Sequence, residues 1–145
     1  MNRIDKSLKV FVGLKRLSAE VEQLVRQDVG SYGLTVNEFA VLEVLFHKGA
    51  MPIQQIKASI LVASSSTTYI VDKLCEKGLV ERYQDKEDKR IIYAHLTESG
   101  TKLMGNSFPS HAERLAELFQ SLSEEELEQF HSIIKKITNY QKKTP

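Results

Sequence analysis

A run of five hydroxyl side chains followed by a tyrosine opens a short helix-forming stretch. It reads SSSTTY over residues 64–69. Small hydroxyls donate and accept hydrogen bonds at close range, and a helix N-terminus adds backbone amides and a positive dipole end. These groups match the base edges and phosphate oxygens of DNA. The serines could instead only cap the helix, but capping uses one hydroxyl and leaves the others unexplained.

Helical spacing divides the stretch from Ser64 to Lys77 into two faces. One face is apolar apart from one threonine and is expected to point into a core. Its members are Thr67, Ile70, Val71 and Leu74. The opposite face is polar and is expected to be exposed, so it is the surface offered to DNA. Its members are Ser65, Thr68, Tyr69, Asp72 and Glu76.

A charged hairpin is expected directly after that helix. Residues 79–83 and 91–96 are rich in β-forming side chains, and they flank a charged tip at residues 84–90. A solvated turn would have the same balanced charge, but the position after a polar-faced helix favours an arm that enters the minor groove. The tip holds Asp85, Lys86, Glu87, Asp88, Lys89 and Arg90.

Asp72 is the one carboxylate expected near the middle of the DNA-facing surface. Phosphates repel a carboxylate unless a cation neutralises it. We therefore expect Asp72 to form an ion pair that orients a basic residue of the hairpin.

The remaining reactive side chains form no catalytic or metal-binding pattern. Cys75 is the single cysteine and lies on the flank of the helix expected at residues 64–77, so it is a candidate redox sensor. A buried structural cysteine is the commoner case. Cys75 has no histidine partner nearby in sequence, and a glycine-rich phosphate loop is missing, so no enzyme is expected. No cofactor or metal is expected either, because the histidines are scattered. These are His47, His95, His111 and His131.

Composition excludes several classes of protein. The 145 residues suffice for one domain with its own core, and one cysteine excludes an intramolecular disulfide. The net charge is only +1, so affinity for DNA must come from locally placed cations. The N-terminus is too polar for a signal peptide, and no apolar run approaches a membrane span. A cytoplasmic protein without membrane contact is expected.

Long amphipathic segments flank this central region. Residues 4–30 carry apolar side chains over more than one face, which indicates a partner subunit as cover, with burial in the protein's own fold as the alternative. Thr35 and Glu38 have the spacing of a capping box for a central core helix. Residues 98–142 are helical in pattern, and Pro109 is expected to kink or restart the helix there.

Three motifs give the chain a recognisable signature. VDKLCEKGLVER occupies residues 71–82, DKEDKR residues 85–90 and LTESG residues 96–100, and GLTVNEFAVL at residues 33–42 adds a fourth match. The sequence resembles the MarR family of bacterial transcriptional regulators over nearly its whole length. The sequence around the helix expected at residues 64–77 is also similar to sequences of the branch of that family that responds to quinones and related electrophiles.

The resemblance implies a fold and a domain layout. The fold is mainly α with a small β-hairpin wing (α+β): a winged helix-turn-helix with N- and C-terminal dimerisation helices. Residues 1–145 form a single domain, with a DNA-binding lobe at 35–97 and dimerisation helices at 4–30 and 98–142. The partners implied are a second copy of the chain and double-stranded DNA with a palindromic operator.

The resemblance also assigns roles to residues. Arg90 enters the minor groove, and Asp88 supports the wing. Asp72 is expected to support the wing as well, through the ion pair inferred above from its position. The family commonly has a basic residue at position 64 and an arginine at position 69, so the serine and tyrosine found here imply a different operator. The full expected DNA-binding set is Ser64, Ser65, Ser66, Thr68, Tyr69, Lys73, Lys86, Lys89 and Arg90.

The expected function is repression of transcription that ends when a signal releases the protein from DNA. The signal is a small aromatic ligand, phenolic or quinone-like, or oxidation of the thiol. The alternatives are a winged-helix module for protein contacts only and a metal-responsive regulator. The expected ligand pocket is lined by Phe11, Leu14, Phe39, Phe46, Phe108 and Leu115.

Overall fold

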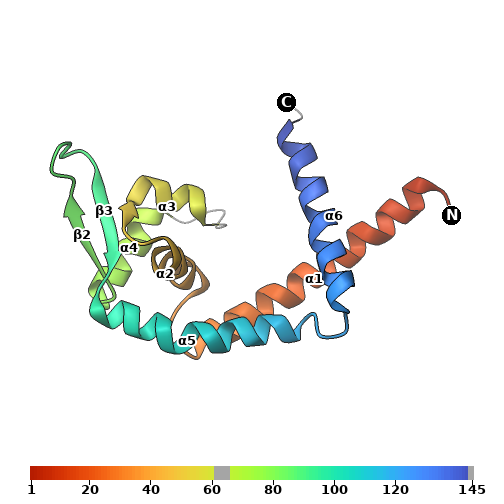
Figure 1. Ribbon diagram of the computed structural model, residues 1–145, viewed down its shortest axis with the longest axis horizontal. Helices are drawn as coiled ribbons and strands as arrows, with labels where there is room; N and C mark the ends of the chain where they lie inside the picture. Colours follow the sequence, from red (N-terminus) through yellow and green to blue (C-terminus); the bar gives the residue numbers. More distant parts are fainter. Residues whose placement is uncertain (61–65, 144–145) are drawn as a thin grey trace. The chain divides into compact units, whose positions relative to one another are not determined.

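The computed structural model describes residues 1–60 and 66–143, which form helices and one small antiparallel sheet (Figure 1). The mainly α fold with a β-hairpin wing is confirmed. Ser64 and Ser65, two of the expected DNA contacts, lie outside the described residues. The elements are α1 (Arg3–Gly30), α2 (Val36–Lys48), β1 (Met51–Pro52), α3 (Ile53–Ser59), α4 (Thr67–Glu76), β2 (Val80–Gln84), β3 (Ile92–Leu96), α5 (Glu98–Glu117) and α6 (Glu124–Lys143).

The turn between α1 and α2 is fixed by local hydrogen bonds. Gly33 has a φ of 77°, which glycine adopts without strain, and the amide of Leu34 donates to the carbonyl of Val29 at 3.2 Å. The amide of Glu38 donates to the Thr35 hydroxyl at 3.1 Å, and the Glu38 carboxylate accepts from the Thr35 amide at 2.9 Å. The expected capping box is therefore present and sets the start of α2.

The sheet has the strand order β1-β3-β2, and its strands are antiparallel. The hairpin of β2 and β3 pairs Val80 with Leu96 and Gln84 with Ile92. The two-residue strand β1 was not expected from the sequence. It pairs with the middle of β3, and so it joins the start of α3 to the wing.

The core lies between helices α2, α3 and α4 and the three-stranded sheet. The apolar face expected for α4 is buried, with Val71 and Leu74 fully inaccessible. These side chains pack with buried residues of α2 and the strands. Burying one such side chain contributes about 2 kcal/mol. The other buried apolar residues include Val41, Leu42, Leu45, Ile56, Ile70, Val80, Ala94 and Met104.

The start of α5 is tied to the wing. The Thr97 hydroxyl donates to the carbonyl of Gly78 at 2.7 Å and accepts from the amide of Gly100 at 3.0 Å, so it caps α5. A Cβ at position 100 would collide with the backbone of Leu79. Thr97 and Gly100 of the LTESG motif are therefore needed where the helix meets the wing.

Of the two outcomes expected at Pro109, a restart of the helix is wrong and a kink stays a prediction. Helix α5 runs from Glu98 to Glu117 with the proline inside it. Proline removes one backbone donor, but its ring suits helical φ, so the helix continues where packing holds both sides. Ser107 and His111, on either side of the proline, are both buried.

A buried polar cluster joins the end of α1 to α5. Nδ1 of His111 lies 2.6 Å from a carboxylate oxygen of Asp28, and both side chains are almost fully buried. The hydroxyl of Tyr32 lies 3.2 Å from the same carboxylate, and the ring of Phe39 lies 4.5 Å from the His111 ring. This cluster fixes the end of α1 against α2 and α5.

The chain forms two compact units, Met1–His111 and Ala112–Pro145, and each is described by itself. In the second unit the rings of Phe119 and Phe130 lie 6.5 Å apart. Helix α6 begins with three glutamates at the positive end of its dipole. No helix within the described part of the chain is long and apolar enough to cross a membrane. The exposed apolar side chains of α6 are Leu127, Ile133, Ile134, Ile137 and Tyr140.

Candidate nucleic-acid interface

The outer face of α4 presents the polar side chains that the sequence predicted. Thr68 and Asp72 are exposed, and Tyr69 is 59% exposed. Ser66 is the N-cap residue by its backbone, but its side chain forms no capping hydrogen bond. Its exposed hydroxyl is therefore free of the capping role that was the alternative explanation for it.

Lys73 lies on the flank of the same face. Its ammonium is 5.5 Å from the centre of the Tyr69 ring and 3.5 Å from the Glu76 carboxylate. Both contacts are exposed and weak, so the ammonium can exchange them for a phosphate at small cost. The contact with Tyr69 keeps this cation next to the tyrosine on the α4 surface.

The tip of the wing is a tight turn built by two aspartates. The Asp85 carboxylate accepts from the amide of Asp88 at 3.0 Å, and the Asp85 amide donates to the carbonyl of Ile91 at 2.9 Å. An aspartate that binds backbone amides two or three residues ahead stabilises a turn. Asp85 and Asp88 thus have a structural role, whereas Lys86 and Lys89 are exposed.

Asp88 holds Arg90 through two parallel hydrogen bonds. Nε of Arg90 donates to one carboxylate oxygen at 3.0 Å and an Nη atom donates to the other at 3.1 Å. These bonds lower the pKa of the Asp88 carboxyl and raise the pKa of the Arg90 guanidinium. The Arg90 side chain is nevertheless 91% exposed, so the pair presents a charged guanidinium to solvent in a defined orientation.

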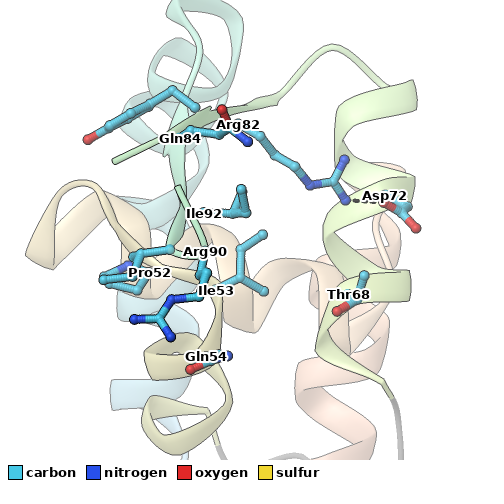
Figure 2. A pocket seen from close by; sticks show the side chains of 11 residues that line it. Pro52, Ile53, Gln54, Thr68, Asp72, Arg82, Gln84, Arg90 and Ile92 are labelled. Atoms are coloured by element: carbon cyan, nitrogen blue, oxygen red, sulfur yellow. Dashed lines mark hydrogen bonds and ion pairs between the residues drawn. The ribbon is translucent and has the colours of Figure 1, made fainter. Parts of the chain in front are cut away.

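A groove of about 580 Å³ lies between α4, the start of α3 and the wing (Figure 2). Thr68 and Asp72 line one side of it and Arg90 lies on the other, so three of the expected site residues share one surface feature. Arg82 of β2 reaches across the groove and forms an ion pair with Asp72.

The sequence did not single out two residues of this groove. Arg82 closes the VDKLCEKGLVER motif, ten residues after Asp72, and its role was hidden because the pairing depends on the strand folding back along α4. Gln54 lies in the first turn of α3 and faces the groove with an amide. Amide and guanidinium groups both donate hydrogen bonds to phosphates and bases.

Cys75 is a free, partly buried thiol. Burial raises its pKa, the nearby Arg82 opposes that effect, and Asp72 adds to it. The thiol is therefore protonated at neutral pH, and a protonated thiol is a poor nucleophile.

The six residues expected to line a ligand pocket are spread over several elements. Phe11 and Leu14 are exposed on α1. The rings of Phe46 and Phe108 lie 6.2 Å apart, so those two side chains are brought together. A common pocket for all six stays a prediction. The buried or half-buried members are Phe39, Phe46, Phe108 and Leu115.

The sequence of this chain matches known regulators. The profile of the MarR family matches residues 34–92. The HTH-type transcriptional regulator MhqR of Bacillus subtilis is 42% identical over 133 residues, which cover 92% of each chain. The chain belongs to the MarR family. It is a DNA-binding transcriptional regulator with a winged helix-turn-helix, and the family is not enzymatic.

Solved structures of MarR-family proteins share the fold. A mutant of E. coli MarR in complex with operator DNA superposes with a TM-score of 0.80 at 20% identity, covering 94% of this chain and 99% of that one. The S. aureus MepR–DNA complex superposes with a TM-score of 0.78 at 25% identity, covering 88% and 94%. In this fold, α4 is the second helix of the helix-turn-helix, the position of the recognition helix in such motifs, and the hairpin of β2 and β3 is the wing.

Proposed function

We propose that the protein is a dimeric repressor that leaves a palindromic operator when a small aromatic ligand, phenolic or quinone-like, binds to it. The observation that carries the DNA-binding part is the groove that α4 shares with the wing. Thr68 on the helix and the oriented guanidinium of Arg90 lie on its two sides, with Tyr69 exposed on the same helix. Such a repressor acts in the cytoplasm of a bacterial cell, where its operator is.

The mode of DNA reading follows from the side chains of α4. The helix carries hydroxyls and a tyrosine on its outer face, so direct readout relies on short polar contacts and on the thymine methyl group rather than on arginine–guanine pairs. Arg90 at the wing tip supports a contact in a narrow minor groove. Few cations are involved per subunit, which supports a moderate dependence of affinity on salt.

Exposed apolar side chains support the dimer. Helix α1 exposes Phe11 and Leu14 by more than half, together with Ile4 and Leu8. Helix α6 exposes an apolar stripe of its own. Stripes of this kind on a terminal helix mark a contact with another chain, and a second copy of the same chain is the partner proposed.

An aromatic ligand is the preferred release signal because of the state of Cys75. Its protonated, partly buried thiol weakens the alternative of thiol oxidation. No group of three metal-ligating side chains occurs within residues 1–60 and 66–143, so no observation favours a metal-responsive regulator.

The test is footprinting on the DNA upstream of the protein's own gene, repeated with candidate quinones, salicylate and an oxidant. Protection of a palindrome with half-sites about one helical turn apart is expected, with release by the aromatic compounds. Binding that ignores sequence would favour the alternative, a winged helix used for protein contacts only. Release by the oxidant alone would assign the signal to Cys75.

A further inference from the structure

Lys77, the residue that follows α4, contacts three acceptors of the α1–α2 region. Its ammonium lies 2.9 Å and 2.8 Å from the two carboxylate oxygens of Glu38 and 3.2 Å from the carbonyl of Gly33. The contacts with Oε1 of Glu38 and with the Gly33 carbonyl are hydrogen bonds, and the contact with Oε2 of Glu38 belongs to the same ion pair. The end of the recognition helix is thereby attached to a turn 44 residues earlier in the chain.

Glu38 is a partner that is itself held in place. Its carboxylate is buried and accepts from the Thr35 amide at 2.9 Å within the capping box of α2. Burial alone would raise the pKa of this carboxyl, but the bonds from Lys77 and Thr35 together hold the pKa below its ordinary value. The carboxylate is charged at neutral pH, and removal of Lys77 would leave it buried without its cation.

Gly33 connects the contact to the dimerisation helix. The amide of Gly33 donates to the carbonyl of Gly30, the last residue of α1, at 3.1 Å. On its other side Lys77 is followed by Gly78, whose carbonyl accepts from Thr97 at the start of α5. One lysine therefore lies where the end of α1, the start of α2, the end of α4 and the wing meet.

We propose that Lys77 is a positioning residue that fixes the angle of α4 relative to α1 and so sets the separation of the two recognition helices in the dimer. This inference rests on the proposed function, in which α1 pairs two copies of the chain. In such a dimer, a recognition helix that rocks about the α1–α2 turn changes the half-site spacing that the protein accepts.

A purely stabilising role for Lys77 would look different in binding. A variant that is only less stable loses active protein, so its apparent affinity falls by the same factor for every operator. A variant whose recognition helix is no longer held by the Lys77 contacts binds operators with half-site spacings that the wild type rejects. The ratio of affinities between spacings therefore separates positioning from stability.

The experiment compares full-length wild type with Lys77→Met and Lys77→Arg on synthetic operators. The duplexes carry the footprinted half-sites at the native spacing and at one base pair less or more. We expect the wild type to prefer the native spacing by roughly tenfold and Lys77→Met to prefer it by less than about threefold. Lys77→Arg keeps the charge and hydrogen bonds and should retain the preference.

Two matched variants complete the design. Lys102→Met removes the same charge from an exposed position on α5 and should leave the spacing preference unchanged. Glu38→Gln keeps a side chain that suits the capping box but removes the ion pair, so it should relax the preference as Lys77→Met does. An unchanged ratio between spacings in both Lys77→Met and Glu38→Gln would overturn the positioning role. Sequence-independent binding by the wild type would instead overturn the proposed function.

Discussion

Asp72 of the recognition helix and Arg82 of the wing strand β2 form an ion pair across the groove between α4 and the wing. Both side chains are partly exposed, so the pair contributes little to the free energy of unfolding, on the order of 0.5 kcal/mol. The ion pair nevertheless links α4 to the wing, and these are the two elements expected to contact DNA. Because Arg82 neutralises Asp72, a carboxylate can be tolerated on the outer face of α4, which is expected to lie near DNA phosphates.

Asp72→Ala is expected to weaken operator binding about threefold to tenfold, because Arg82 is released and the wing loses its link to α4. Loss of a carboxylate near phosphates would by itself strengthen binding, so the sign of the change is informative. Fluorescence anisotropy gives the affinity, and amide hydrogen exchange of β2 and β3 reports the order of the wing. Arg82→Ala and the double variant complete a double-mutant cycle. If Asp72→Ala shows unchanged or stronger binding and unchanged exchange in β2 and β3, the supporting role of Asp72 is refuted.

Arg90→Ala is expected to lower operator affinity roughly tenfold, since it removes an oriented guanidinium at the tip of the wing. The slope of log affinity against log salt concentration should become shallower by about one per subunit. Arg90→Lys keeps the charge without the two parallel bonds to Asp88, so it should keep the slope and lose part of the affinity. An unchanged slope in Arg90→Ala would show that the wing tip does not contact DNA.

Cys75 is expected to react slowly with iodoacetamide in the folded protein. Burial raises the thiol pKa above its ordinary value of 9.0, so the reactive thiolate is scarce at pH 7.5 and increases only as the pH rises past 9. Because the folded state prefers the protonated thiol, this group's contribution to stability is present below pH 9 and is lost above it. The reference is the alkylation rate of the urea-unfolded chain. A folded protein that reacts faster than this reference at pH 7.5 would restore Cys75 as a sensor.

Asp28→Leu and His111→Phe are each expected to lower the free energy of unfolding by about 3 kcal/mol. Each leaves one member of a buried pair without its counterpart, which costs more than the pair contributes. Urea denaturation at pH 7 gives the value. His131→Phe removes an exposed histidine of α6 and should change stability by less than about 0.5 kcal/mol. Equal stabilities for the three variants would be inconsistent with a structural role for the cluster.

Local patterns predicted the elements that carry the site. The spacing of Ile70, Val71 and Leu74 identified the buried face of α4, and Thr35 with Glu38 identified the start of α2. Such features depend on residues three or four positions apart, which the sequence displays directly.

Long-range pairing could not be predicted in the same way. Asp28 and His111 are 83 residues apart, and Lys77 and Glu38 are 39 apart, so no local pattern connects them. Strand β1 has two residues and exists only because β3 lies beside it. Helix α5 likewise continues through Pro109 because tertiary packing overrides the local tendency of proline to end a helix.

The central claim is that the protein recognises a specific DNA duplex through α4 and the wing, and an anisotropy titration tests it most directly. The footprinted operator is compared with a shuffled duplex of the same length and composition over a range of salt concentrations. Affinity for the operator about a thousandfold higher at physiological salt, falling as salt rises, is the predicted result. Equal affinity for the two duplexes at every salt concentration would contradict the account.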